Sequence, residues 1–248
     1  MCTVTFIPKR HGFYLGMNRD ERIARGPATP PARLESACIA AIYPRDIEGG
    51  TWIGVNQFGV AFALLNWNDV ALDSNIEKRR SRGLLIPELL SCASLQQAQA
   101  RIKKLDLSGT LPFRLVAVST ESRMIQQFQW DTRTLTTEAR GWELRHWFSS
   151  SLSDQEAAAK RGETCQIAQR HSEAGSLAWM RKLHRSHLGG PGPFSICVHR
   201  KEVETVGYTE LICTTDQVEC RYSSGSPCLA ETGLHSVEIC ALPRPISH

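Results

Sequence analysis

The chain has 248 residues, of which 42% are hydrophobic and 22% charged, and its formal net charge is +4. Such a composition is typical of a globular protein, and this length can bury a core without disulfide or metal staples. The small charge gives no indication of nucleic-acid binding, and no apolar stretch reaches the ~18 residues of a membrane helix. We expect one domain over residues 1–248 in a soluble protein.

Nine cysteines are scattered singly along the chain, and no two have Cys-x-x-Cys spacing. Because an odd number cannot all pair within one chain, we expect reduced thiols and a cytoplasmic location. The apolar run near the start, residues 4–7, is too short for a signal peptide. Neither a cofactor nor a metal site is predicted.

The first predicted element is a β-hairpin. Residues 3–7 and 13–17 are rich in β-branched and aromatic side chains, and the segment between them has the Pro, Gly and charge of a turn. A hairpin here would fold the segment Asn18-Arg19-Asp20-Glu21 back beside Cys2.

Cys2 would be unusually reactive as the first residue of the chain. We expect Met1 to be removed, which would leave a thiol and a free α-amine on the same carbon of Cys2. An α-amine has a reference pKa of about 7.7–8.0 and a thiol of about 8.5, so the amine can accept the thiol proton near neutral pH. The pattern therefore predicts a nucleophile with its own general base. An inert terminal thiol is the alternative.

The middle of the chain predicts strands, then helix, then strands. Residues 26–31 are rich in Pro and Gly and predict a connector. Periodicity and turn residues predict strands at 37–43, 51–55 and 59–65, a helix over 82–104 that breaks near 91–94, a loop at 107–112, and strands at 113–119, 124–130, 134–139 and 144–149.

The second half repeats this alternation. Ser153-Asp154-Gln155-Glu156 has the spacing of a capping box and predicts a helix from 154 to about 171. A second helix is expected from 177 to about 187, a loop at 189–193, strands at 205–214 and 217–222, and then an irregular end. This order fits two sheets packed between two helical layers.

Ordered motifs in the first ninety residues resemble the NRDE family, which includes the transport and Golgi organisation protein 2 of eukaryotes and many bacterial members. The motifs are Met1-Cys2-Thr3-Val4-Thr5-Phe6 with Leu15-Gly16-Met17-Asn18-Arg19-Asp20-Glu21, then Gly49-Gly50-Thr51-Trp52-Ile53-Gly54-Val55-Asn56 running on to Leu64-Leu65-Asn66-Trp67, and then Ser81-Arg82-Gly83-Leu84-Leu85. The second half is similar more loosely, around Phe148-Ser149-Ser150 and Ile196-Cys197-Val198-His199-Arg200.

The NRDE pattern is in turn similar to cysteine N-terminal-nucleophile hydrolases such as bile salt hydrolases and penicillin V acylases. The resemblance implies an α+β four-layer αββα sandwich and a cysteine amidohydrolase that cleaves an amide or acyl bond of a small molecule through a thioester. It implies Cys2 as nucleophile, with Asn18, Arg19, Asp20 and Asn66 as the other catalytic positions. Arg19 would favour the thiolate, Asp20 would hold the α-amine, and Asn66 would donate to the oxyanion, a role worth ~10²–10³ in rate.

Each of these roles has a plainer alternative. In bile salt hydrolase-like enzymes the arginine precedes the asparagine, at the position of Met17, whereas here it follows Asn18. In an extended strand this shift predicts that Arg19 faces away from the thiol unless the strand bulges. Arg19 and Asp20 could form a surface ion pair, and Asn66 could be a turn residue.

Three residues are candidates for substrate binding. Trp52 could form a pocket wall, although a strand tryptophan is more often core. Ser150 stands where the NRDE pattern has asparagine, and Arg200 could anchor a carboxylate or lie on the surface. The basic run 78–82 predicts a solvated loop, and the segment Cys197-Val198-His199-Arg200 fits no standard zinc spacing.

The resemblance to eukaryotic relatives also implies an alternative function, a non-catalytic carrier or binding protein for haem or acyl-lipid. Such a protein would need an apolar pocket, for example one lined by Trp52, Phe62 and Trp67. A thiol redox function is less favoured because no two cysteines are closely spaced. The partner is a small-molecule substrate or a hydrophobic ligand. The sequence leaves the oligomeric state open.

Overall fold

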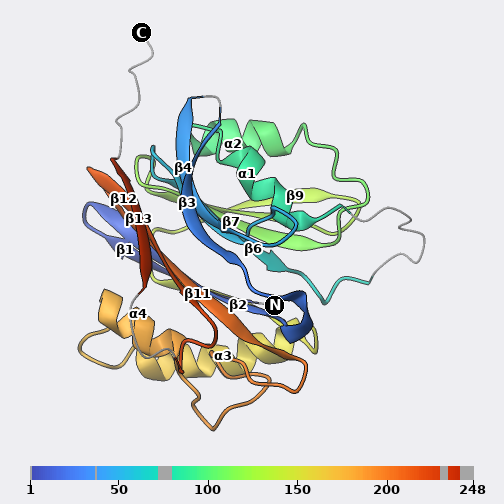
Figure 1. The fold of residues 1–248 in the computed structure, drawn as a ribbon, viewed down its shortest axis with the longest axis vertical. Helices are drawn as coiled ribbons and strands as arrows, with labels where there is room; N and C mark the ends of the chain where they lie inside the picture. The colour runs from blue at the N-terminus through green and yellow to red at the C-terminus, as the bar shows by residue number, and fades with distance from the viewer. Residues whose placement is uncertain (1, 37, 72–79, 230–233, 241–248) are drawn as a thin grey trace.

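A computed structural model describes residues 2–36, 38–71, 80–229 and 234–240. Its centre is two antiparallel β-sheets packed face to face (Figure 1). The six-stranded sheet has the order β10 (Arg145–Ser149), β1 (Cys2–Lys9), β2 (Gly12–Arg22), β11 (Val203–Thr214), β12 (Gln217–Ser224) and β13 (His235–Cys240). The seven-stranded sheet runs β3 (Thr29–Ser36), β4 (Ile39–Arg45), β5 (Ile53–Asn56), β6 (Val60–Asn66), β7 (Phe113–Ser119), β8 (Met124–Trp130) and β9 (Leu135–Arg140).

Helices cover the outer face of each sheet. The short helices α1 (Leu85–Leu89) and α2 (Leu95–Ile102) pack on the seven-stranded sheet, and α3 (Asp154–Ala168) and α4 (Leu177–His184) pack on the six-stranded sheet (Figure 1). The four-layer αββα sandwich is thereby confirmed. No helix among the described residues combines the length and apolarity needed to cross a membrane.

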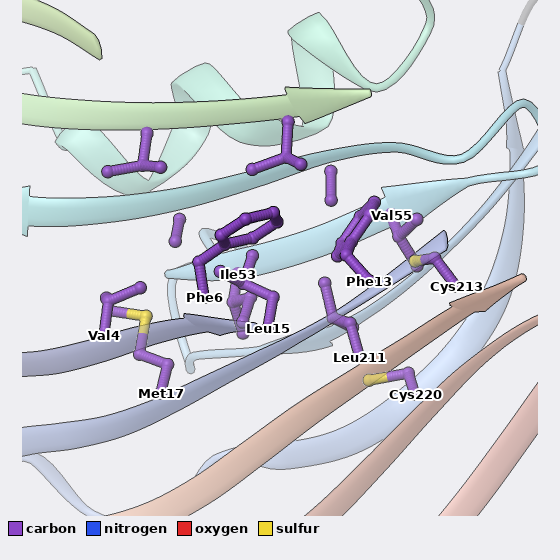
Figure 2. Close-up of a cluster of buried hydrophobic side chains, with 14 of the residues drawn as sticks. Val4, Phe6, Phe13, Leu15, Met17, Ile53, Val55, Leu211, Cys213 and Cys220 are labelled. Carbon is purple, nitrogen blue, oxygen red and sulfur yellow. The ribbon is translucent and has the colours of Figure 1, made fainter. Parts of the chain in front are cut away.

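The predicted hairpin of β1 and β2 is confirmed, and its alternating side chains divide between two layers. Residues such as Val4, Phe6 and Met17 point into the space between the sheets, where they pack with side chains from β5, β11 and β12 (Figure 2). The intervening polar residues, Thr5 and Asn18 among them, face the layer of α3 and α4. One hairpin thus contributes to the apolar core and to a buried polar layer.

Serine caps open α2 and α3, and the start predicted at Ser153 is confirmed. The Ser94 hydroxyl accepts a hydrogen bond from the Gln97 N–H at the start of α2, and Ser153 accepts one from the Glu156 N–H at the start of α3. These bonds satisfy backbone donors that a helix start otherwise leaves without partners.

Two edge strands were not predicted. The end of the connector expected at 26–31 belongs to β3, which begins at Thr29. Pro30 and Pro31 lie at an irregularity of the β3–β4 pairing, between Thr29 and Ala32. An edge strand tolerates proline there, since its outer N–H groups have no ladder partner. The other missed strand, β13, forms an edge of the six-stranded sheet, in what was predicted to be an irregular end.

Candidate active site

Cys2 and Arg19 lie directly opposite each other in the β1–β2 pair. The register is unbroken along this hairpin, and residues directly opposite in an antiparallel pair point to the same face. The expectation that Arg19 faces away from the thiol is therefore wrong. The cross-strand register sets the face, and the order of arginine and asparagine along β2 does not.

The Arg19 guanidinium is held in a fixed position between the sheets. It lies over the Trp52 ring, 4.5 Å from the ring centroid, and 3.5 Å from a Glu21 carboxylate oxygen. The Trp52 indole N–H in turn donates a hydrogen bond of 3.3 Å to the Thr209 hydroxyl. The cation is 6% exposed, so its charge is screened by little solvent.

Cys2 opens into a cavity of about 520 Å³ at the ends of strands from both sheets. The cavity brings together five of the predicted site residues: Cys2, Arg19, Asp20, Trp52 and Asn66. The other described residues that line it are Glu21, Arg25, Asp46, Glu48, Thr51, Leu64, Arg80, Ser81, Arg82, Gly83 and Leu111.

Asn18 points to the opposite side of β2, toward the helical layer. Its side-chain NH₂ donates to the backbone carbonyls of His184 and Ile196, each at 2.9 Å. Its Oδ1 lies 3.0 Å from the His184 ring nitrogen Nδ1. These hydrogen bonds join β2 to α4 and to the loop before β11. Asn18 therefore positions β2 and does not face the cavity.

Asp20 lies within a buried polar network beneath Cys2. Its carboxylate accepts a 2.7 Å hydrogen bond from the Thr205 hydroxyl and pairs at 3.4 Å with the Arg161 guanidinium of α3. Arg161 also donates to the Cys2 carbonyl at 3.3 Å and to the Thr3 hydroxyl at 2.9 Å. Sequence reasoning missed Arg161, because nothing in the pattern of α3 distinguishes it from a solvated helix residue.

The surroundings of the Cys2 thiol act on its pKa in both directions. Burial raises the pKa, and the negative charge of Asp20 adds to the rise. The positive charge of the amino terminus, a hydrogen bond from the Asp20 backbone and the Arg19 cation oppose it, and the pKa remains raised. A proton acceptor close to the sulfur is therefore needed to form the thiolate at neutral pH.

Arg82 is a second cation beside the cysteine. The prediction of a solvated basic run is wrong for this residue, which is half-buried in the cavity wall and donates a 2.9 Å hydrogen bond to the Pro112 carbonyl. Burial lowers its pKa, and the charges of Cys2 and Glu21 act against that lowering. Among the described residues, no carboxylate forms an ion pair with Arg82. Residues 78 and 79 of the run lie outside the described residues.

Two glycines allow the Arg82 segment to reach the cavity. The Thr51 N–H donates a 3.0 Å hydrogen bond to the Gly83 carbonyl. A Cβ on Gly83 would lie 3.1 Å from the Thr51 nitrogen and 3.2 Å from the Gly50 Cα, so a side chain there would require the neighbouring backbone to shift by a few tenths of an ångström. The sequence motifs at 49–56 and 81–85 thus meet at the cavity wall.

Asn66 ends β6 and lines the cavity in a half-buried position. Within the described part of the chain, its side-chain amide makes no hydrogen bond, so its N–H groups are available to a ligand.

Ser150 and Arg200 do not line this cavity. The Ser150 N–H donates to Asp154 Oδ1 at 2.7 Å, and its hydroxyl accepts from the Leu152 N–H at 3.3 Å, which places it in the turn that opens α3. Arg200 donates to the neighbouring Ser151 hydroxyl at 3.3 Å. Both contacts lie at the start of α3, and the roles of these residues in substrate binding stay predictions.

Comparisons with known proteins place this arrangement among known folds. The sequence model described as "Transport and Golgi organisation 2" matches residues 1–180. Penicillin V acylase from Agrobacterium tumefaciens is similar in structure, with a TM-score of 0.58, 12% identity, and 90% of this chain and 83% of that chain covered. No curated protein matches the sequence.

Conjugated bile acid hydrolase from Clostridium perfringens is also similar, in two altered forms. A mutant has a TM-score of 0.55 at 8% identity, with 99% of each chain covered. A variant has a TM-score of 0.56 at 8% identity, with 96% of this chain and 92% of that chain covered. At such low identity these likenesses show a shared fold.

Proposed function

This chain belongs to the Transport and Golgi organisation 2 family, and we propose that it is a cysteine amidohydrolase with Cys2 as its N-terminal nucleophile. Its substrate is a small molecule with an amide or related acyl bond. The observation that carries the proposal is the pairing of Cys2 with Arg19 on one face, in a cavity that Asn66 also lines.

The proposed reaction has two halves. After removal of Met1, the Cys2 α-amine takes the thiol proton and Sγ attacks the carbonyl carbon, forming a C–S bond. The Asn66 amide donates a hydrogen bond to the oxyanion. The C–N bond then breaks, and the leaving amine takes the proton from the α-ammonium. Water attacks the thioester and forms the C–O bond of the acid product, while the α-amine accepts a proton from the water. The C–S bond then breaks, and the α-ammonium gives its proton to the sulfur to restore the thiol.

The buried charges around Cys2 favour these proton transfers. The α-ammonium that forms during attack requires a nearby anion, and Asp20 acts electrostatically on Cys2. Asp20 is itself positioned by Arg161 and Thr205. The Arg19 cation favours the thiolate, because an opposite charge close by stabilises the ionised form.

The position of Arg82 favours a substrate that carries an anionic group. Its guanidinium is half-buried in the cavity wall, and the hydrogen bond to the Pro112 carbonyl leaves further N–H donors for a ligand. Arginine suits this role because its planar fork can bind a carboxylate or phosphate through two hydrogen bonds.

The lining favours acyl transfer over the carrier alternative. Charged side chains surround the cavity, whereas pockets for haem or acyl chains are predominantly apolar. Of the three aromatic residues expected to line a hydrophobic site, Trp52 lines this cavity, while Phe62 is fully buried among α1, α2 and their sheet.

The test uses amides related to those named for the structural relatives. Penicillin V and a conjugated bile acid are incubated with the full chain, with Cys2→Ala and with Cys2→Ser, and products are followed by mass spectrometry. We expect hydrolysis and a transient acyl group on the N-terminal peptide with the unchanged chain. Equal turnover by Cys2→Ala would contradict the proposal.

A further inference from the structure

Four metal-ligand side chains converge where the loop before β11 meets the segment after β12. They are His187, Cys197, His199 and Cys228, and their ligand atoms all lie within 4.8 Å of one another. The first three belong to the connection between α4 and β11, and Cys228 follows β12. The proposed hydrolase chemistry uses none of them.

The geometry at His199 is not that of ordinary hydrogen bonding. Its Nε2 lies 3.0 Å from His187 Nε2, 3.3 Å from Cys228 Sγ and 3.7 Å from Cys197 Sγ. One ring nitrogen offers either a single N–H or a single lone pair, so it cannot satisfy three partners. A cation at the centre of the four atoms would satisfy all of them together.

The separations also fit a tetrahedral ion. Zinc–nitrogen and zinc–sulfur bonds of ~2.0–2.3 Å place neighbouring ligand atoms of a tetrahedron roughly 3.3–3.8 Å apart. The three distances measured from His199 Nε2 lie in or close to this range. Two imidazoles with two thiolates are a ligand set that suits zinc.

We propose that His187, Cys197, His199 and Cys228 bind one Zn²⁺ in a closed structural site. Binding replaces the two thiol protons with two Zn–S bonds and releases both protons to solvent, so the ion and the two thiolates together are neutral. Four protein ligands leave no open position for substrate, so the ion stabilises the fold and takes no part in catalysis.

The linear sequence concealed this site. Nine residues separate His187 from Cys197, one separates Cys197 from His199, and the fourth ligand follows two further strands. No standard zinc spacing has this form, which is why the segment at 197–200 was predicted to hold no metal. The fold supplies the missing ligand by placing the segment after β12 beside the loop before β11.

The site would fix a loop that also supports the cavity residues. Ile196, next to Cys197, accepts a hydrogen bond from Asn18 through its carbonyl. The Val198 N–H donates a 2.8 Å hydrogen bond to the Thr205 hydroxyl, which donates to Asp20. An ion at this loop would therefore stabilise the attachment of β11 to β2.

The first experiment measures metal in the full chain, purified with a thiol reductant. We expect about one zinc per chain by elemental mass spectrometry, and loss of that zinc in Cys197→Ser and in Cys228→Ser. Two exposed residues outside the cluster supply matched controls, Cys38→Ser and His171→Gln, which should keep it. Retention of zinc by both cluster variants would overturn the site.

The second experiment does not depend on variants that fold. Zinc is removed from the wild-type chain with a chelator and Co²⁺ is added. We expect thiolate-to-cobalt absorption together with the intense visible bands of tetrahedral cobalt, and a Tm lower by at least about 5 °C in the metal-free chain. A reduced chain that holds no zinc and gives no thiolate–cobalt absorption would overturn the proposal.

Discussion

Arg161 of α3 and Asp20 of β2 form an ion pair of 3.4 Å in which neither side chain is exposed to solvent. The pair joins the helical layer to the strand that faces Cys2. Removing one partner of a buried pair leaves an uncompensated charge, and this typically costs about 3–5 kcal/mol. We expect Arg161→Met to destabilise the fold by an amount in that range, measured by urea unfolding.

The matched control is Arg33→Met. Arg33 pairs with Glu35 at 2.7 Å on an exposed edge strand, and such surface pairs contribute under about 1 kcal/mol. Equal unfolding free energies for the two variants would show that the buried pair stabilises the fold no more than the surface pair does.

Arg82 should determine how Cys2 reacts with charged reagents. Both groups line the same cavity, and the charge of Cys2 acts on the ionisation of Arg82. We expect Arg82→Gln to lower the ratio of iodoacetate to iodoacetamide alkylation rates at Cys2 by about fivefold, which corresponds to roughly 1 kcal/mol of charge interaction. Peptide mapping of the alkylated chain gives both rates. An unchanged ratio would remove the argument for an anionic substrate.

Asn66 should act in the chemical step. If its amide donates to the oxyanion, Asn66→Ala lowers kcat by ~10²–10³ on any amide that the chain hydrolyses, with little change in KM. The alkylation rate of Cys2 should not change, because alkylation forms no oxyanion. A variant with wild-type kcat would assign Asn66 to the turn after β6.

Lowering the pH should destabilise the fold through His184. The ring is fully buried and lies 2.9 Å from the Thr5 hydroxyl and 3.0 Å from Asn18 Oδ1. Burial, together with nearby His146, lowers the pKa of His184 to about 3, whereas an unfolded histidine has a pKa of about 6.5. Between these two pH values the unfolded chain binds the proton more strongly than the folded chain does. The stability that depends on a neutral His184 is therefore fully present above about pH 6.5 and is lost as the pH falls.

The expected loss from this group is about 2 kcal/mol of unfolding free energy between pH 7 and pH 5. Urea unfolding at the two pH values measures it, and His184→Gln should reduce the difference by that amount. The same pH dependence in the variant would show that other groups cause the acid destabilisation.

Local features of the fold could be predicted from sequence because their causes are local. The hairpin of β1 and β2 follows from two β-rich stretches around a turn, and Ser94 and Ser153 cap helices within three residues. The αββα arrangement and the pairing of Cys2 with the segment at 18–21 follow from these elements and from family resemblance.

Features that depend on contacts distant in sequence could not be predicted. Arg161 meets Cys2 and Asp20 across more than 140 residues, and no local pattern signals it. The face of Arg19 depends on cross-strand register, which one position in a strand does not determine. Arg82 looked like a surface charge because the glycine contact that brings its segment to the cavity joins two separate motifs.

The proposed reaction depends on Cys2 gaining its reactivity from its own α-amine. The direct measurement compares iodoacetamide alkylation at Cys2 in the chain that starts at Cys2 with a chain carrying one alanine inserted before it. Burial raises the thiol pKa in both, but an amide nitrogen in the inserted form cannot accept the proton. We expect the thiol of the processed chain to react faster than exposed Cys38 and at least about tenfold faster than the same thiol behind the insertion. Equal rates in the two chains would contradict it.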